Sequence, residues 1–449
     1  MAESTTITNA QELVKRSLFL FGAGATRDAG CKVSKDMLEA LQKMDWTAPE
    51  KEAIDFLLSC LSYHATWKNQ KEGKSYNSTP YAPNIEDLVL LIRRIVNRDS
   101  YLPYPITGSW ADKITFLELE WRELPQHRQS AQTVKPLFIN LEEKITRKLY
   151  EWLKLGKENT DYLNPISEYL KVTSDSGPRL EFFTTNYDLV FEKHFNREDV
   201  TNLDCGFNAG IYSGIDHQKP SCRINYYKLH GSLNWKRNNL GKTAEFFSYN
   251  NDGTKLKVLE EPEGSESIES EVQEIEPDKF LSSPPADPLI IFGHGGKFLS
   301  IDPFISLIYD FKQLLTEKDI YFVIGYSFFD PYINNIILEG LSKGGVNPKR
   351  MIVVNPGFSK EAMFSTEENN DGVTEENWKS RFVDYIQNIQ RSTYLSDLPG
   401  YNITEVSPSL IKIIPEKTSS FLSQYFGTNC EGLSALFGEL EGEREDIFK

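Results

Sequence analysis

Three short polar segments hold the residues best suited to chemistry, and each directly follows an apolar run. The first segment is Gly22-Ala23-Gly24-Ala25-Thr26. Its glycines allow a sharp turn and a close approach of the backbone to a ligand, and the start of a following helix would offer N–H groups to a pyrophosphate. The third glycine of a G-x-G-x-x-G motif would fall at Arg27, so an ordinary strand-to-helix turn is the alternative.

The second segment is Thr184-Thr185-Asn186-Tyr187-Asp188. Polar residues at the carboxyl end of a strand in an α/β sheet face the ligand crevice. The Asn186 side chain has both a donor and an acceptor, which suits it to hold a ribose or a water molecule. The alternative is that Asn186 and Asp188 cap the helix that follows.

The third segment is Lys228-Leu229-His230-Gly231-Ser232, in which a histidine follows an apolar strand. A histidine can act as a general base near neutral pH, because its ordinary pKa is about 6.5. The glycine after it admits close approach of a ligand. The alternative is a buried histidine with a purely structural role.

The elements that must position these segments are six apolar runs, which predict buried strands. Each run is four or five residues long and nearly continuous in hydrophobicity, as expected for strands covered on both faces. Several lead through small residues into a helical pattern, which predicts an α/β, Rossmann-like domain with a mainly parallel sheet. Asp330 and Pro331 are expected to cap one such helix. The runs are Ser17–Phe21, Leu180–Thr184, Tyr226–Leu229, Leu289–Phe292, Ile320–Ile324 and Met351–Val354.

The pattern of apolar residues divides the chain into three parts. The α/β domain is predicted over residues 1–34 and 171–360. Residues 35–170 are predicted to form a large helical insertion, because their apolar residues recur at helical spacing. Residues 361–449 are predicted to form a small C-terminal appendage that could serve as an oligomer contact.

The chain of 449 residues has 49 basic and 65 acidic residues, a formal net charge of −16. So acidic a chain is poorly suited to grip nucleic acid over its general surface, and we expect no direct nucleic-acid binding. Much of the excess lies in residues 260–278, which hold nine carboxylates and no Lys or Arg. This acidic tract indicates a solvated loop, and a contact with a partner is the alternative.

Hydropathy and cysteine content indicate the cellular compartment of the protein. No apolar run approaches the roughly 20 residues of a membrane-spanning helix, and the first residues lack the pattern of a secretory signal. The five cysteines are odd in number and form no C-x-x-C pair, so they indicate reduced, mostly buried thiols and no cysteine-rich zinc site. We therefore expect a cytoplasmic protein without a metal and without membrane association.

In their order and spacing, the three segments resemble the sirtuin (SIR2) family, in particular the SIR2-like domains of bacterial anti-phage defence proteins. The resemblance covers roughly residues 17–34 and 180–357. The matches are Gly22–Thr26 for the family's G-A-G-x-S loop, with Thr26 in place of Ser; Thr184, Asn186 and Asp188 for its T-x-N-x-D motif; His230 and Gly231 for its catalytic H-G pair; Phe292-Gly293 for a later F-G strand end; Gly325 and Ser327 for its G-x-S element; and Asn355 for its ribose-binding asparagine.

The resemblance implies a role for each matched residue. Asn186 and His230 would be catalytic, and Gly22–Thr26 would hold the pyrophosphate of NAD+. Asn186 and Asp188 would hold the nicotinamide ribose, with Thr184 beside them. The adenosine end of NAD+ would lie near Gly325, Ser327 and Asn355.

The departures from the family are as informative as the matches. Sirtuin deacylases carry four zinc-binding cysteines after the H-G pair, whereas this chain has no cysteine between Cys222 and Cys430. Residues 30–34 (GCKVS) also replace the I-P-x-F-R segment of those enzymes. The parts that build an acyl-lysine tunnel are thus missing or rebuilt. The resemblance therefore implies an NAD+ hydrolase that uses water as the acceptor and releases ADP-ribose and nicotinamide.

The resemblance further implies an effector that depletes NAD+ in anti-phage defence by abortive infection. Such an enzyme must be held inactive in healthy cells, so we expect a homo-oligomer and a separate regulatory partner, such as a HerA-type ATPase or a prokaryotic Argonaute. Two alternatives stay open. One is an NAD-dependent protein deacylase or ADP-ribosyltransferase, and the other is a non-catalytic scaffold that senses NAD+ or ADP-ribose.

Overall fold

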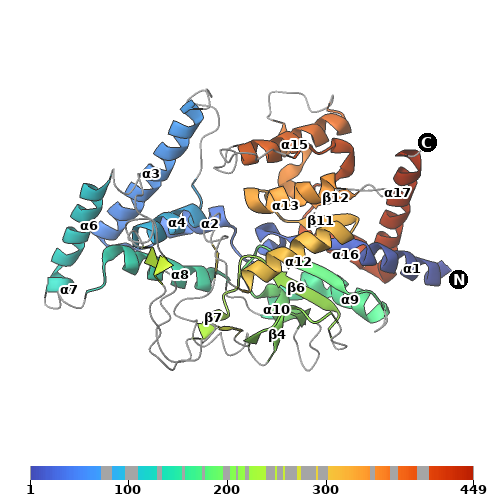
Figure 1. Ribbon diagram of the computed structural model, residues 1–449, viewed down its shortest axis with the longest axis horizontal. Helices are drawn as coiled ribbons and strands as arrows, with labels where there is room; N and C mark the ends of the chain where they lie inside the picture. Colours follow the sequence, from blue (N-terminus) through green and yellow to red (C-terminus); the bar gives the residue numbers. More distant parts are fainter. Residues whose placement is uncertain are drawn as a thin grey trace. The chain divides into compact units, whose positions relative to one another are not determined.

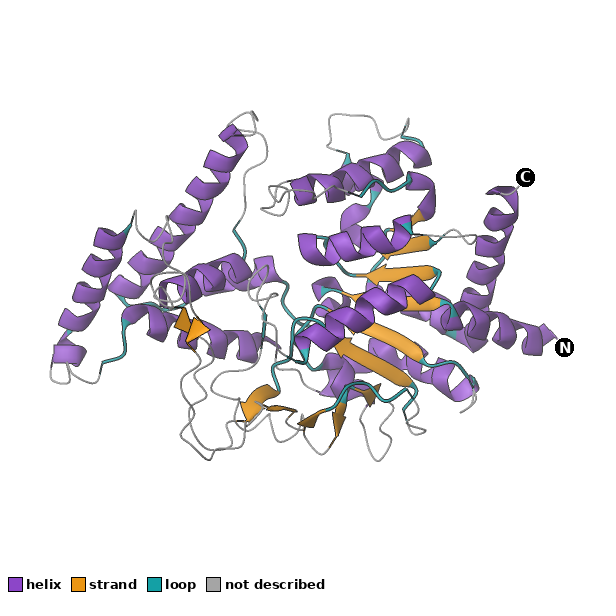
Figure 2. Ribbon diagram, viewed as in Figure 1, coloured by secondary structure: helices purple, strands orange, loops and turns teal. Residues whose placement is uncertain are grey.

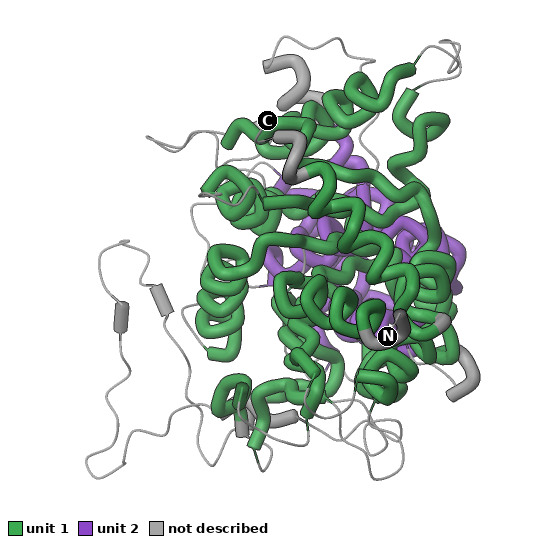
Figure 3. Tube along the Cα trace, turned by 90° about the vertical axis from the view of Figure 1, so that its right-hand side faces the viewer, with its two compact units in different colours: residues 1–31, 154–236, 272–449 green, residues 32–153, 237–271 purple. Residues whose placement is uncertain are grey.

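The computed structural model describes most of the chain and divides it into two compact units. Figure 3 colours them separately: residues 1–31, 154–236 and 272–449 form the first, and residues 32–153 and 237–271 the second. The described residues are 2–71, 83–96, 110–128, 134–153, 157–173, 177–195, 203–208, 211–217, 222–238, 248–249, 256–257, 271–274, 290–291, 302–343, 349–364, 373–391 and 404–447.

The core of the first unit is a seven-stranded sheet whose neighbouring strands are all parallel (Figure 2). The strand order is β13-β12-β11-β1-β2-β6-β3. Without the edge strand β3, this is the 3-2-1-4-5-6 order of a dinucleotide-binding Rossmann sheet. The predicted α/β, Rossmann-like class is therefore confirmed. The strands are β1 (Ser17–Phe21), β2 (Leu180–Thr184), β3 (Leu203–Asp204), β6 (Ile224–Lys228), β11 (Ile320–Ile324), β12 (Arg350–Val354) and β13 (Ile411–Ile414).

Helices surround this sheet, and a second set builds the other unit (Figure 1). In the first unit they are α1 (Ala2–Lys15), η1 (Ala23–Ala29), η3 (Lys157–Leu163), α9 (Asn164–Val172), α10 (Val190–Phe195), α12 (Phe304–Glu317), α13 (Pro331–Ser342), η4 (Pro356–Phe358), α14 (Lys360–Met363), α15 (Glu375–Arg391), η7 (Pro408–Leu410), α16 (Thr418–Phe426), η8 (Thr428–Cys430) and α17 (Glu431–Ile447). In the second unit they are α2 (Ser34–Gln42), α3 (Ala48–Lys71), α4 (Ile85–Val96), α6 (Ala111–Glu123), α7 (Pro125–Arg128) and α8 (Leu137–Leu153). Short strands outside the sheet are β4 (Phe207–Asn208), β5 (Ile211–Tyr212), β7 (Trp235–Asn238), β8 (Ser248–Tyr249), β9 (Leu256–Lys257) and β10 (Glu271–Glu274).

Apolar helix faces cover both sides of the sheet, which explains the nearly continuous hydrophobicity of its strands. On one side, residues such as Leu20 and Val323 share a buried cluster with Phe311 of α12 and Ile337 of α13. On the other side, aromatic rings dominate. Phe19 stacks on Phe322 with ring centroids 4.8 Å apart, and it also contacts a ring of α16. All residues of the five-residue strands are buried.

The predicted strands agree well with the structure. The bounds of β1, β2 and β11 are as predicted, and those of β6 and β12 differ by one or two residues. Of the predicted strand Leu289–Phe292 only residues 290 and 291 are described, and Ile290 forms an isolated bridge with Gly231. The short edge strand β3 and the sixth long strand, β13, were not predicted.

The C-terminal segment differs from the prediction. Residues 361–449 are not an appendage, because β13 pairs in parallel with β12 and extends the central sheet. The sequence Ile411-Lys412-Ile413-Ile414 is as short as the predicted run Tyr226–Leu229, which also carries a lysine, so its hydrophobicity was a signal that the prediction overlooked. The predicted insertion is also shorter than expected at its end, since η3 and α9 belong to the first unit.

Replacement of Phe426 by Ala tests whether the C-terminal segment belongs to the core. Phe426 is 1% exposed, and its ring centroid lies 5.8 Å from that of Phe19 in β1. We expect Phe426→Ala to lower the free energy of unfolding by about 3–5 kcal/mol in urea titrations. Tyr309→Ala, on a residue that is 65% exposed, should change it by less than about 0.5 kcal/mol. If Phe426→Ala left the free energy of unfolding unchanged, this packing would be contradicted.

Candidate functional site

The strand ends that precede the predicted motifs lie in register along one edge of the sheet. Each neighbouring pair aligns the last residue of one strand with the last residue of the next. Because the strands are parallel, the segments that follow leave the sheet at its carboxyl edge, where α/β proteins bind ligands. From β12 to β6, the aligned residues are Val354, Ile324, Phe21, Thr184 and Lys228.

The glycine loop and Gly325 meet where the strand order reverses, between β1 and β11. The N–H of Gly22 donates to the carbonyl of Ile324 (2.9 Å), and the N–H of Gly24 donates to the carbonyl of Gly325 (2.8 Å). A Cβ on Gly325 would lie 2.2 Å from the nitrogen of Ala25, and Gly325 has a φ of +64°. The approach of the two backbones is therefore itself a reason for glycine at these positions.

After Gly22 the chain continues as the 3-10 helix η1, so the predicted strand-to-helix turn is present in a tighter form. Ala25 also donates its N–H within the loop, to the carbonyl of Gly22 (2.9 Å). Three N–H groups of the loop are thus engaged inside the protein. Ala23 is exposed and Gly24 is half-buried, so these two residues form the accessible surface of the loop.

A hydrogen-bond network joins the glycine loop to the T-x-N-x-D segment. The Asn186 Nδ2 donates to the carbonyl of Gly22 (2.9 Å) and to the Thr26 hydroxyl (3.2 Å). That hydroxyl donates to Asp188 Oδ2 (2.8 Å). Thr184 Oγ1 accepts the N–H of Asn186 (2.9 Å). The structure therefore brings together predicted residues that are about 160 positions apart in the sequence.

Asp188 also caps the helix that follows, which is the alternative role considered for this segment. Its Oδ1 accepts the N–H of Val190, the first residue of α10 (3.1 Å). Asn186 differs, because its amide nitrogen faces the glycine loop. The thiol of Cys31 is buried near Asp188, and burial raises the pKa of Cys31, with a smaller contribution from the Asp188 charge. This thiol therefore stays protonated and is a poor nucleophile.

A buried ion pair lies beside Asp188. Lys228 Nζ lies 2.6 Å from Glu192 Oε1 and donates to the carbonyl of Asp188 (2.5 Å). The side chains of Lys228 and Glu192 are 0% and 1% exposed. Burial raises the pKa of both Asp188 and Glu192, and the charge of Lys228 opposes this effect. The pKa values stay raised because burial outweighs the charge of Lys228 at both carboxylates.

His230 contacts the start of α13. Its Nε2 lies 3.1 Å from Asp330 Oδ2, and both residues are buried. The predicted cap is present as well, because Asp330 Oδ1 accepts the N–H groups of Tyr332 and Ile333. The N–H of Ile291 donates to the carbonyl of His230 (2.9 Å). Asp330 therefore links the third polar segment to the helix that follows β11.

The residues predicted near the adenosine end lie just beyond the carboxyl ends of β11 and β12. Asn355 ties these two strand ends together, since its Nδ2 donates to the carbonyl of Tyr326 (3.0 Å) and its Oδ1 accepts the N–H of Gly357 (2.9 Å). Ser327 is exposed at the same edge. Contacts of Ser327 and Asn355 with NAD+ stay predictions.

The sequence analysis missed two contributions to the site. Two of its other predictions fall mostly on residues that the structure does not describe. It assigned no role to the Lys228–Glu192 pair, although a lysine inside an apolar strand was a signal. It gave Asp330 a capping role only, and its contact with His230 spans 100 positions without a local signal. Phe292-Gly293 and most of residues 260–278 lie outside the described residues.

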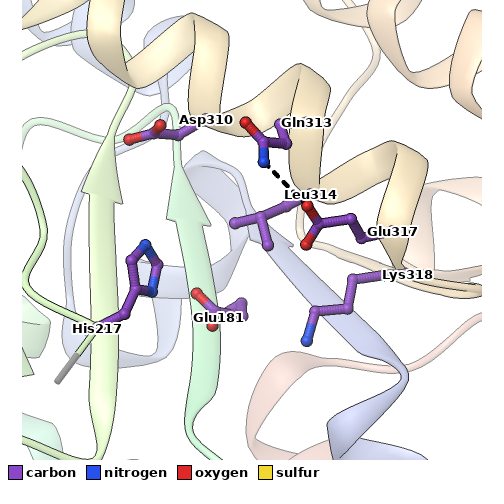
Figure 4. A pocket seen from close by; sticks show the side chains of 7 residues that line it. All are labelled: Glu181, His217, Asp310, Gln313, Leu314, Glu317 and Lys318. Atoms are coloured by element: carbon purple, nitrogen blue, oxygen red, sulfur yellow. Dashed lines mark hydrogen bonds between the residues drawn. The ribbon is translucent and has the colours of Figure 1, made fainter.

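A separate cavity lies near the amino ends of the strands. It has a volume of about 320 Å³, and Figure 4 shows its side chains, which extend from β2, from α12 and from the segment around His217. The buried Glu181 carboxylate accepts hydrogen bonds from Asn225 and Tyr227 there. Three carboxylates among the lining residues make this cavity unsuited to a dinucleotide. The residues are Glu181, His217, Asp310, Gln313, Leu314, Glu317 and Lys318.

One comparison with known proteins bears on this geometry. Residues 180–263 match the family model of the SIR2-like domain. The matched segment starts at β2 and contains both the T-x-N-x-D residues and the His230-Gly231 pair, so the predicted resemblance is confirmed over this range. SIR2-like domains bind NAD+, and the match therefore supports an NAD-related activity. A search of curated proteins gives no match.

Within the part of the chain that the structure describes, no group of three or more His, Cys, Asp or Glu side chains is placed to hold a metal ion. None of its helices is both long enough and apolar enough to cross a membrane.

Replacement of Gly325 by Ala tests the backbone contact at the site. We expect the free energy of unfolding to fall by about 3 kcal/mol or more, because the new Cβ would clash with Ala25 and the residue needs a positive φ. The matched control is Gly438→Ala in α17, where a Cβ meets nothing within 4 Å. That variant should gain about 0.5–1 kcal/mol from helix propensity. Equal stabilities of the two variants in urea titrations would contradict the proposed cause.

Replacement of Lys228 by Met tests the buried charge cluster. We expect a loss of about 3–5 kcal/mol at pH 8, because two carboxylates lose their buried cation. The folded-state pKa values of Asp188 and Glu192 are already raised and rise further without Lys228. Stability should therefore fall as the pH rises above about 4, and the loss should be smaller at pH 5 than at pH 8. Urea titrations at both pH values measure this difference.

The control for this variant is Lys135→Met, which removes an exposed ion pair with Glu143. It should cost less than about 1 kcal/mol at either pH. A loss in Lys228→Met that does not depend on pH would mean that packing, and not charge, explains the effect.

Proposed function

We propose that this chain hydrolyses the nicotinamide–ribose bond of NAD+ and releases ADP-ribose and nicotinamide. The observation that carries the proposal is the placement of Asn186 and His230. Each lies two residues beyond an aligned strand end, Thr184 or Lys228, on adjacent parallel strands at the carboxyl edge. The strand order reverses between β1 and β11, which is where sheets of this kind bind dinucleotides. This reversal and the SIR2-like match over residues 180–263 support the same substrate.

The dinucleotide would lie across the carboxyl edge of the sheet. Its pyrophosphate would contact the accessible surface of the glycine loop at Ala23 and Gly24. Its adenosine end would extend over the ends of β11 and β12, toward Ser327 and Asn355. The nicotinamide ribose would then lie over the ends of β2 and β6, within reach of Asn186 and His230.

The reaction consumes NAD+ and water and yields ADP-ribose, nicotinamide and one proton. The C1′–N bond breaks heterolytically and its electron pair leaves with the ring, so a cationic pyridinium becomes neutral nicotinamide without protonation. His230 accepts a proton from the attacking water or from a ribose hydroxyl. Asn186 orients the ribose or the water, and the Asp188 network holds Asn186 in place. General-base catalysis of this kind contributes about 10²–10⁴-fold.

Water is the proposed acceptor because the parts that build the acyl-lysine tunnel of sirtuin deacylases are missing or rebuilt in this sequence. The chain has no cysteine from 223 to 429, so it lacks the cysteine tetrad that accompanies the acyl-lysine tunnel of sirtuin deacylases. A chain that freely hydrolyses NAD+ would harm its own cell. We therefore propose a regulated effector that depletes NAD+ in anti-phage defence, held inactive by self-assembly or by a partner protein.

Replacement of Asn186 or His230 by Ala tests the proposed activity. The purified chain is incubated with NAD+, and nicotinamide and ADP-ribose are quantified by chromatography. Each variant should lose at least about 100-fold in turnover, because it lacks the orienting or the basic group. The matched control is His217→Ala, an exposed histidine at the amino end of the sheet, which should keep wild-type turnover.

Three results would contradict the proposal. Wild-type turnover in both site variants would remove the assignment of Asn186 and His230. Nicotinamide release that requires an acetyl-lysine peptide would indicate a deacylase. A calorimetric signal for NAD+ without product, measured alone and with the product of a neighbouring gene, would indicate a sensing scaffold.

A further inference from the structure

We propose that Asp330 is a positioning residue, which holds His230 with its proton on Nε2 and so leaves Nδ1 as the nitrogen that accepts the proton in the reaction. This inference rests on the proposed function for the catalytic step. The placement of the proton itself is independent of any activity. The carrying observation is the 3.1 Å contact between His230 Nε2 and Asp330 Oδ2.

Asp330 is held firmly enough to orient an imidazole. Its Oδ1 accepts the N–H groups of Tyr332 (3.0 Å) and Ile333 (3.3 Å) at the first turn of α13. Its carbonyl accepts the hydroxyl of Tyr326 (3.3 Å). One carboxylate oxygen is thus fixed by the helix, and the other faces His230. Both side chains are less than a tenth exposed, so water competes weakly for the contact.

The turn that carries Asp330 is also braced from within. Asn334 Nδ2 donates to the carbonyl of Phe328 (2.6 Å). The Tyr326 hydroxyl shares its one proton between the Asp330 carbonyl and Asn334 Oδ1 (3.2 Å). Phe328 has a φ of +56°, which is uncommon for a residue other than glycine. The segment from Gly325 to Asp330 therefore has a defined shape, and it starts at the same Gly325 that contacts the glycine loop.

The direction of the hydrogen bond follows from the chemistry of the two groups. An ionised carboxylate has no proton to donate, so the imidazole nitrogen that faces it must carry one. The first turn of α13 offers N–H groups and a positive dipole end, which favour the ionised carboxylate. In neutral His230 the lone pair then lies on Nδ1. The imidazolium that forms during the reaction keeps Asp330 as its counter-charge.

Asp330→Asn separates the positioning role from the capping role. Asparagine caps helices about as well as aspartate, so the melting temperature should change by no more than about 2 °C. Its amide nitrogen would face Nε2 as a donor and favour the other tautomer. We expect kcat to fall by about 10²–10⁴-fold, with KM changed less than about threefold, because Asp330 does not contact the substrate.

Two further variants complete the comparison. Asp330→Ser keeps a capping hydroxyl but is too short to contact His230, so it should also lose turnover while it stays folded. The control is Ser359→Ala, which removes the N-cap of α14. It should lower stability slightly and leave kcat unchanged. If Asp330→Asn and Asp330→Ser were folded and kept full turnover, Asp330 would serve only as the N-cap of α13, and the proposal would be overturned.

Nitrogen NMR of histidine-labelled protein reads the tautomer directly and without substrate. The His230 signals are assigned by their absence in His230→Ala. In the wild type we expect a protonated Nε2 and an unprotonated Nδ1, and in Asp330→Asn the reverse. A wild-type His230 with its proton on Nδ1 would overturn the proposal. Because this measurement needs no turnover, a failure of the proposed NAD+ hydrolysis would leave it interpretable.

Discussion

The close backbone contact between the segments after β1 and β11 is the constraint on which the site depends. Gly24 donates its N–H to the carbonyl of Gly325, and a side chain at either position would meet backbone atoms. The contact lies at the point where the strand order reverses. The glycine loop, the G-x-S turn and, through Asn186, the T-x-N-x-D segment are all held to this point. The positions of the candidate catalytic groups follow from it.

Two polar clusters extend the site from that contact into the interior. On the β2–β6 side, Lys228 and Glu192 form a buried ion pair beside Asp188, and Asp188 in turn accepts a hydrogen bond from Thr26. On the other side, Asp330 links His230 to α13. Buried charges cost free energy unless they are paired and hydrogen-bonded. Their use here indicates that the position of each polar group is specified, as a pre-organised site requires.

Local sequence patterns predicted much of the fold. Five of the six predicted strands are present at nearly the predicted bounds, because a buried parallel strand needs a continuous apolar run and β-branched or aromatic residues satisfy this locally. The strand β13 was overlooked, although Ile411–Ile414 has the same length as the predicted run Tyr226–Leu229 and, like it, contains one lysine. Its place in the sheet depends on pairing with β12, which lies about 60 residues earlier. For the same reason residues 361–449 were assigned to an appendage.

The amino-acid sequence by itself determined which residues end each strand, and with them the glycine loop, the T-x-N-x-D segment and the His230-Gly231 pair. It also determined the resemblance that a family comparison confirms over residues 180–263. Only the tertiary structure decided which strand ends are neighbours and which side chains meet. The contacts of Asn186 with Gly22 and of His230 with Asp330 join residues at least 100 positions apart. Hydrophobic runs specify strands locally, whereas these contacts arise from the order and register in which the whole sheet packs.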